Sequence, residues 1–426
     1  MSLPGNLKSA LLIFVAILLT GNPVQAQVEH DTIPRKGIKL YKKPFPPVRG
    51  DLFILAMPIV SYNPSNGFMF GAGMASSLFL GDPLSTRISS VQTSIMYTTK
   101  KQLLVNFKST IYTKDNHWIF NGDWRYMDTS QPTYGLGTGP ASSKLASNGF
   151  EIGDNIYSAP IDDAQMMSYK HIRFYETVTR EVTDNLYLGL GYHLDIFTDV
   201  DDQLADTTAD PPVITSYYAY NVNYGFEQDR NMLSGFSLNA SYDSRDNQNC
   251  TYKGQYANVS LHINPEFLGS DKNSTVLYTE YRKYFDLTGN HRNMLCFWGI
   301  GNFLTSGSVP YMDLPALGED QYSKSGRGYT VGRFRGQSLI YGEVEFRKHL
   351  WASAKRPDFL GMVVFLNAVT ASNRDAEIKL FNYVNTAGGI GIRIMASKNA
   401  RTRLGIDYAW GNYGSSGFYL RMNETF

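Results

Sequence analysis

The chain has 426 residues and a formal net charge of +1, with 39 Lys and Arg residues against 38 Asp and Glu residues. This balance argues against a nucleic-acid partner, which would require a strongly basic surface. Charged residues make up only 18% of the chain, whereas it contains 29 Tyr and 38 Gly. Such a composition is more typical of membrane-spanning strands than of a cytosolic enzyme.

The first residues have the pattern of a secretory signal peptide. Lys8 supplies a positive charge, Ala10 to Leu19 are apolar, and residues 24–26 form a small-residue cleavage site. The apolar run is about half of the roughly 20 residues that a spanning helix needs. We therefore expect residues 1–26 to be a cleaved signal peptide rather than an uncleaved anchor.

The next segment, residues 27–51, is rich in Pro and Lys. It is too short and too Pro-rich to fold alone, which predicts an extended periplasmic arm or an insert in the pore.

From residue 52 onward, apolar and polar residues alternate in nearly every segment. In 236–245 and in 403–410, for example, one face is apolar and the other carries Asp, Asn, Ser or Arg. Segments of about ten residues with this alternation are typical of strands that cross a bilayer. No window shows sustained helical periodicity.

Counting such segments back from residue 426 gives about sixteen strands, an even number as a closed antiparallel bacterial barrel requires. The sequence therefore predicts an all-β fold, a transmembrane β-barrel over residues 52–426 with both ends on the periplasmic side. The candidate strands lie near 53–62, 66–80, 86–99, 101–113, 116–127, 164–181, 184–198, 231–245, 253–265, 273–288, 291–306, 336–350, 357–373, 380–396, 400–412 and 416–426.

The lengths of the connections support this count. The long connections 128–163, 199–230 and 307–335 all fall on one side, and short turns fall mostly on the other. A soluble multi-sheet β protein has no reason to separate its loops in this way, whereas outer-membrane barrels do. We therefore expect an outer-membrane location in a Gram-negative bacterium. The final strand ends in Phe426, which resembles the insertion signal of outer-membrane barrels.

Three motifs resemble those of the BamA/TamA-type barrels, also called bacterial surface antigens. The turn at Asp243, Arg245 and Asp246 resembles the Asp-Thr-Arg-Asp turn of that family. Residues 326–329, with Arg327, Gly328 and Tyr329, resemble the motif on its sixth extracellular loop, and residues 343–347 resemble the strand after it. The strand count independently makes 307–335 the sixth outer loop.

The resemblance implies that Arg327 folds into the lumen and pairs with Glu345, with Glu343 beside it. A guanidinium inside a narrow barrel needs such partners to offset its lost hydration. The alternative is that Arg327 is a solvated loop cation. The family's second acidic partner aligns with Asn367, which implies that this loop latch is one carboxylate short. The proline usual after the turn motif is also absent, its place occupied near Cys250.

Members of that family carry POTRA repeats before the barrel, and residues 27–51 leave no room for one. We therefore expect a member lacking POTRA domains that acts in protein translocation or outer-membrane assembly with a separate periplasmic partner, which the basic arm at 35–49 would contact. The alternatives are a passive channel, a surface-exposed binding barrel and a lipid-modifying enzyme.

Other expected partners are outer-membrane lipids and the barrel assembly machinery that inserts the chain. No enzymatic activity, cofactor or metal site is expected, because the seven His residues are scattered singly. Export would permit a disulfide between Cys250 and Cys296, but their spacing does not decide this.

Overall fold

The computed structural model describes residues 49–63, 66–139, 149–153, 156–162, 164–351, 358–398 and 400–426. All of them belong to one compact unit, Lys43–Phe426. The predicted signal peptide and nearly all of the predicted arm lie outside the described residues.

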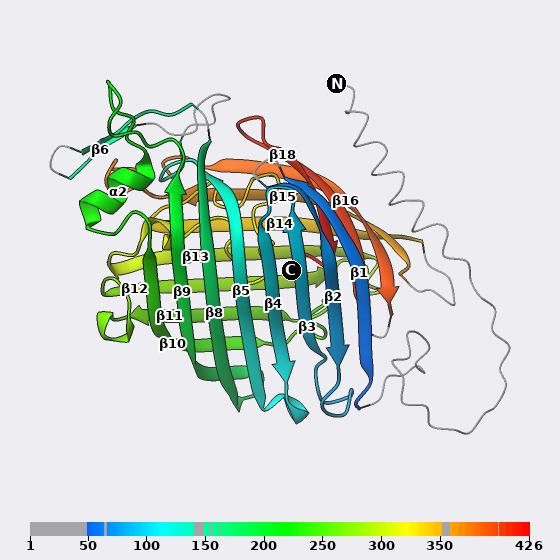
Figure 1. Cartoon of the computed structure of the whole chain (residues 1–426). Coiled ribbons are helices and arrows are strands. Elements are labelled where there is room, and N and C mark those ends of the chain that lie inside the picture. Colours follow the sequence, from blue (N-terminus) through cyan, green and yellow to red (C-terminus); the bar gives the residue numbers. More distant parts are fainter. Residues whose placement is uncertain are drawn as a thin grey trace. The chain divides into compact units, whose positions relative to one another are not determined.

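Sixteen strands form a single antiparallel sheet that curves into a barrel, and each strand pairs with the next one along the sheet (Figure 1). The predicted fold and strand count are confirmed, and each candidate segment overlaps one strand. The strands are β1 (Leu52–Asn63), β2 (Gly67–Leu78), β3 (Ser89–Thr98), β4 (Leu103–Tyr112), β5 (Trp118–Thr133), β8 (Gln165–Thr183), β9 (Leu186–Asp202), β10 (Asn231–Asp243), β11 (Gln255–Asn264), β12 (Ser274–Asp286), β13 (Asn293–Gly307), β14 (Ser338–Trp351), β15 (Leu360–Ala371), β16 (Asn385–Ser397), β17 (Thr402–Gly411) and β18 (Ser416–Met422).

The predicted alternation becomes an apolar exterior and a polar interior. On β9, Leu188 and Leu190 are 48% and 64% exposed on the outer surface, whereas His193 and Asp195 are buried. An apolar outer band and a polar lumen are what a strand between lipid and water requires. The long connections that follow β5, β9 and β13 leave the strands at one end of the sheet, and the two-residue turn 184–185 lies at the other end, which we take as the periplasmic side.

Several short elements lie in the connections. The helix α2 (Ser216–Tyr224) begins after Thr215, whose hydroxyl accepts a hydrogen bond from the Tyr218 amide (3.1 Å), and it ends at Gly225. No helical periodicity in the sequence indicated this helix. Among the described residues, no helix combines the length and apolarity needed to cross a bilayer. The remaining elements are the hairpin β6 (Phe150–Ile152) and β7 (Ile156–Ser158), and the 3-10 helices η1 (Lys114–Asn116), η2 (Glu266–Leu268) and η3 (Tyr311–Asp313).

The connection between β13 and β14, residues 308–337, is called the lumenal loop because it crosses the barrel interior. On one wall, Tyr322 hydrogen bonds to Thr110 of β4 (3.1 Å). Elsewhere on the wall, the Gly328 amide donates to the Tyr419 hydroxyl of β18 (2.8 Å). A backbone bridge between Ala316 and Arg335 joins the two arms of the loop. The loop therefore fills much of the space that an open pore would need.

The two edges of the sheet differ from all its other strands. Within the described residues, no backbone pairing joins β1 to β18. Pro58 lies within β1, and an edge strand tolerates Pro because the missing N–H can face away from the ladder. The last strand ends at Met422, four residues earlier than predicted, because Asn423 has φ 65° and turns the chain away from the sheet. We call this unpaired boundary between β1 and β18 the seam.

Candidate functional site

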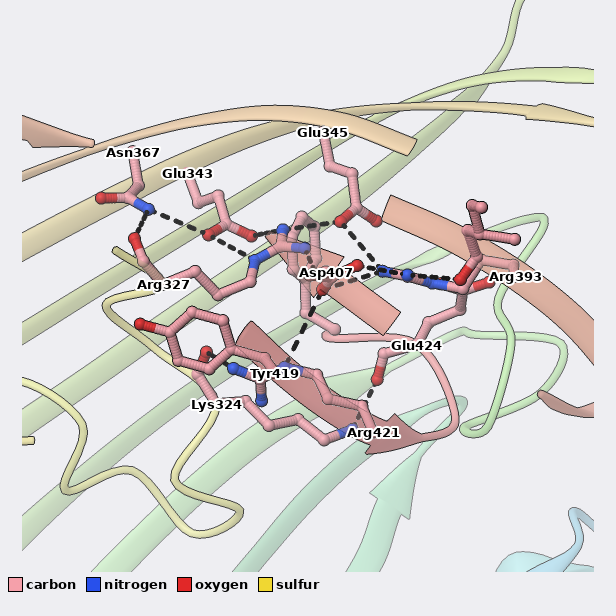
Figure 2. Close-up of polar contacts among 12 residues, drawn as sticks. Lys324, Arg327, Glu343, Glu345, Asn367, Arg393, Asp407, Tyr419, Arg421 and Glu424 are labelled. Atoms are coloured by element: carbon pink, nitrogen blue, oxygen red, sulfur yellow. Dashed lines mark hydrogen bonds and ion pairs between the residues drawn. The ribbon is translucent and has the colours of Figure 1, made fainter. Parts of the chain in front are cut away.

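The lumenal loop is fixed to the barrel wall by Arg327, whose side chain is fully buried. Its Nη2 lies 2.5 Å from Glu343 Oε1 and 2.6 Å from Glu345 Oε2, and both carboxylates project from β14 (Figure 2). The guanidinium carbon also lies 3.4 Å from the centre of the Phe365 ring, an arrangement that adds cation–π attraction. Arg327 is therefore a lumenal cation with fixed partners rather than a solvated one.

A third carboxylate completes this cluster. Arg327 Nη1 donates to Asp407 Oδ2 of β17 at 2.9 Å. The expectation that the cluster is one carboxylate short is therefore wrong. Asn367, at the position of the expected acid, instead donates from Nδ2 to the Arg327 carbonyl oxygen at 2.9 Å. The sequence placed Asp407 on the polar face of its strand but could not show that β17 and the loop meet.

Room for Asp407 depends on a glycine on the neighbouring strand. A Cβ atom at Gly391 of β16 would lie only 1.9 Å from Asp407 Oδ1, so any side chain there would displace the carboxylate. Gly328 in the loop has φ 102°, and a Cβ there would lie 2.6 Å from the Ala387 side chain. The two glycines thus let the loop backbone and the Asp407 side chain approach β16 closely.

Tyr329, two residues after Arg327, also attaches the lumenal loop to the barrel wall. Its hydroxyl donates to the Thr386 carbonyl oxygen at 2.6 Å and accepts from the Asn412 amide at 3.1 Å. Its backbone oxygen accepts from the Tyr419 hydroxyl at 3.3 Å. Arg327, Gly328 and Tyr329 therefore contact β14, β16, β17 and β18 together, within one side of the barrel.

The ion pairs continue towards the periplasmic end. Glu345 also accepts from Arg347 Nε at 2.6 Å, and Asp407 Oδ1 accepts from Arg393 Nη1 at 2.5 Å. Arg393 in turn donates from Nε to Glu424 at 2.8 Å (Figure 2). The network alternates in sign, so that each buried charge has an opposite neighbour, as burial requires.

At the tip of the lumenal loop, Asp320 organises the turn that precedes Arg327. Its carboxylate accepts from the Ser325 amide (2.8 Å) and the Ser325 hydroxyl (2.7 Å) and from the Lys324 amide. Burial acts to raise the pKa of the Asp320 carboxyl, but these hydrogen bonds outweigh it and hold the pKa below its ordinary value.

The turn motif of Asp243, Arg245 and Asp246 lies apart from the Arg327 cluster. Arg245 donates to both carboxylate oxygens of Asp243, at 2.9 and 3.0 Å, and Tyr112 of β4 donates to the same carboxylate at 2.9 Å. Asp246 accepts from Arg401 Nη1 at 2.5 Å. The motif therefore orders the periplasmic turn, residues 244–254, and ties it to two other parts of the barrel.

The periplasmic turn also connects the two sides of the seam. Gln248 Nε2 donates to the Ile88 carbonyl oxygen, at the start of β3, at 2.7 Å. The adjacent Asn249 donates to the Ala400 carbonyl oxygen, before β17, at 2.9 Å. Phe79, Ile88 and Ala400 form a small apolar cluster at the same boundary. Polar and apolar contacts at the periplasmic end thus replace the missing strand pairing.

Phe426 lies inside the lumen rather than on the lipid face. It is 4% exposed and packs with Trp298 and Tyr284. A role as an insertion signal concerns the unfolded chain and stays a prediction. Cys250 and Cys296 are both buried free thiols. Within the described ranges, no group of three or more His, Cys, Asp or Glu side chains is arranged to hold a metal ion.

Replacing Arg327 by Ala is expected to destabilise the folded barrel by about 3–5 kcal/mol, because three buried carboxylates would lose their shared cation. Denaturant titration of the refolded protein, read by its heat-modifiable mobility in gels, measures the change. Lys379→Ala, which removes an exposed cation from another outer loop, is the control and should leave stability unchanged. Equal stability of Arg327→Ala and the control would contradict a structural role for Arg327.

Asn367→Asp is expected to lower stability by about 1–3 kcal/mol, although it restores the acid implied by the family resemblance. The new carboxylate could not donate to the Arg327 carbonyl oxygen, and it would lie beside Glu343 Oε2, now 3.5 Å from the amide nitrogen. Denaturant titration of the refolded variant, as for Arg327→Ala, measures the change in stability. A more stable Asp variant would show that the cluster does lack a carboxylate.

Comparison with known proteins agrees with this geometry. A family model described as the Omp85 superfamily domain matches residues 142–426. The solved structure of BamA from Haemophilus ducreyi lacking POTRA domains 1–3 has a TM-score of 0.53 and 18% identity, over 88% of this chain and 69% of that one. CdiB from Acinetobacter baumannii has a TM-score of 0.49 and 11% identity, over 87% and 59%. No curated sequence gives a significant match. Because the family match covers more than half of its length, this chain belongs to the Omp85 superfamily and is an outer-membrane β-barrel.

Proposed function

We propose that this barrel takes part in protein translocation or outer-membrane assembly by receiving a client strand at the seam, with a separate periplasmic partner. The observation that carries the proposal is the missing pairing between β1 and β18 in a sheet whose other neighbours are all paired within the described residues. A transport or assembly role, rather than catalysis, also agrees with the family.

The physical reason is the cost of unpaired backbone in lipid. Amide and carbonyl groups that face hydrocarbon without partners cost several kcal/mol each. An unpaired edge is also a ready template for another strand. A client strand that paired with β1 or β18 would satisfy these groups. The seam therefore favours strand addition in the plane of the membrane.

The lumen supports this role more than a passive channel. The lumenal loop contacts β4, β14 and β17, and the buried network of Arg327 holds it there. A cavity of about 250 Å³ remains beside the loop, lined in part by His193, Asp195 and Tyr278. A partly filled lumen suits a barrel whose exchange with clients takes place at its edge.

The periplasmic partner is the second part of the proposal. If residues 1–26 are removed, the Pro- and Lys-rich arm precedes β1 directly and is a basic segment suited to contact an acidic partner surface. In this proposal the partner captures clients, and the barrel accepts them at the seam.

Photocrosslinking tests the role of the seam. A photoreactive residue at Val60 of β1 or Phe418 of β18, both 60% exposed, is expected to capture nascent outer-membrane proteins in cells. The matched control is Leu190 of β9, which is 64% exposed but away from the seam. Equal capture at Leu190 and at the seam would contradict the proposal.

Bilayer recordings separate this function from a passive channel. We expect the wild-type barrel to be closed and the Arg327→Ala variant to show openings, because the lumenal loop loses its anchor. Lys379→Ala should behave as the wild type. A steady open pore in the wild-type protein would favour the channel, and a closed, folded Arg327→Ala barrel would show that Arg327 does not hold a plug.

A further inference from the structure

The cavity of about 250 Å³ beside the lumenal loop has the lining of a binding site for a small molecule. Inward-facing side chains of β5 and of β8 to β14 form its wall, and residues 312–321 of the lumenal loop form much of its other side. Pockets for drug-sized ligands usually have roughly 300–1,000 Å³, so this cavity has room for one small molecule and not for a peptide. None of the described residues that line it belongs to the Arg327 cluster.

Neutral side chains form a hydrogen-bonded row across three strands of this wall. Ser260 Oγ of β11 donates to Asn239 Oδ1 of β10 at 2.6 Å, and Asn239 Nδ2 donates to Ser237 Oγ at 2.7 Å. The Ser237 hydroxyl therefore has its own hydrogen left to donate to His193 Nε2 of β9, at a distance of 2.7 Å. This network assigns the ring hydrogen of His193 to Nδ1.

Three polar groups at the cavity have no partner. His193 is 7% exposed, and its Nδ1 makes no hydrogen bond within the described part of the chain. The same is true of Asn302 Oδ1 on β13 and of Asp313 Oδ2 on the lumenal loop. All three residues line the cavity. Buried donors and acceptors without partners are costly, so a ligand that supplied partners for them would be held.

Carboxyl groups outnumber guanidinium groups at this cavity. Six carboxyl groups line it, from Asp123, Asp195, Glu280, Asp313, Glu319 and Asp320. Four guanidinium groups line the cavity or form ion pairs with these carboxylates, from Arg125, Arg173, Arg282 and Arg335. The cavity therefore favours a ligand that carries a positive charge.

Asp313 is the acid beside which that charge is missing. Arg335, which lines the same cavity, donates instead to the carbonyl oxygens of Tyr311 and Met312, at 3.0 and 2.5 Å. Burial and the Asp195 carboxylate raise the pKa of the Asp313 carboxyl well above its ordinary value. An ammonium group beside Asp313 would favour the ionised carboxylate and would donate a charge-assisted hydrogen bond to it.

The aromatic residues of the cavity suit the same kind of ligand. The ring centre of His193 lies 4.4 Å from that of Tyr175 and 4.1 Å from that of His262, and all three rings line the cavity. Aromatic faces attract cations and also pack against the carbon atoms of a ligand. The wall thus offers apolar contact beside its polar groups.

We propose that this cavity binds a small hydroxylated amine, such as an amino sugar. The ammonium group of the ligand binds Asp313, and its hydroxyl groups, which both donate and accept, bind His193 and Asn302. Because Asp313 belongs to the lumenal loop and the other two residues to β9 and β13, the ligand attaches the loop to strands that the Arg327 cluster does not contact. This inference does not depend on the role of the seam.

The test compares glucosamine with glucose, which has a hydroxyl in place of the ammonium group. The full chain is refolded in a detergent that carries no sugar and in a buffer without amines, and isothermal titration calorimetry measures both affinities. We expect the wild-type protein to bind glucosamine at least about tenfold more tightly than glucose, which corresponds to about 1.4 kcal/mol. Asp313→Asn should abolish this preference. The control Asp184→Asn, which changes an exposed carboxyl group in a periplasmic turn, should keep it.

A second variant tests the hydroxyl contacts and serves if Asp313→Asn does not fold. His193→Phe keeps a ring and removes the N–H group, so it should weaken the binding of both sugars without changing the ratio of their affinities. Heat-modifiable mobility confirms that each variant is folded.

Equal affinities for the two sugars in the wild type, or binding of neither, would overturn the proposal and leave a cavity that holds only water. A preference for glucosamine that persists in folded Asp313→Asn would do the same, because the ammonium group would then bind elsewhere. Unchanged affinities in His193→Phe would also contradict the site.

Discussion

The need to pair every buried charge governs the interior of this barrel. Arg327 is fully buried with three carboxylates around it, and a lone guanidinium there would face a large desolvation cost. The pairing fixes the lumenal loop, and the loop in turn fills the lumen. Since Asp407 belongs to β17, the same ion pair also positions the strand next to β18. Occlusion of the lumen and order near the seam therefore share one cause.

Much of the fold could be predicted from sequence because lipid imposes a simple rule. Alternation along each strand gave the number of strands, and the separation of long and short connections gave their direction. Arg327 could be matched with Glu343 and Glu345 through the resemblance to the BamA/TamA-type barrels, in which the loop arginine pairs with acidic residues of the strands that follow. Asp407 could not be found in this way, because it lies 80 positions from Arg327 and meets it only through the curvature of the sheet.

Two other features could not be predicted from the sequence, because local backbone conformation rather than the alternation of apolar and polar residues determines them. The α2 helix is rich in Tyr and Asn, residues with modest helix propensity, and its ends are fixed by Thr215 and Gly225. The final strand reads as regular to residue 426, but the left-handed backbone at Asn423 turns Phe426 inward. Neither change alters the alternation on which the strand prediction depended. Both became visible only in three dimensions.

The periplasmic turn bears on the order in which the barrel forms. Strands adjacent in the chain pair as hairpins, whereas Gln248 reaches Ile88 over 160 positions and Asn249 reaches Ala400 over 151. Closing such long loops costs more chain entropy than closing a hairpin, so contacts of this range form late. We therefore expect two neighbouring side chains in the middle of the sequence, Gln248 and Asn249, to complete the structure last, by joining the segments before β3 and β17 across the seam.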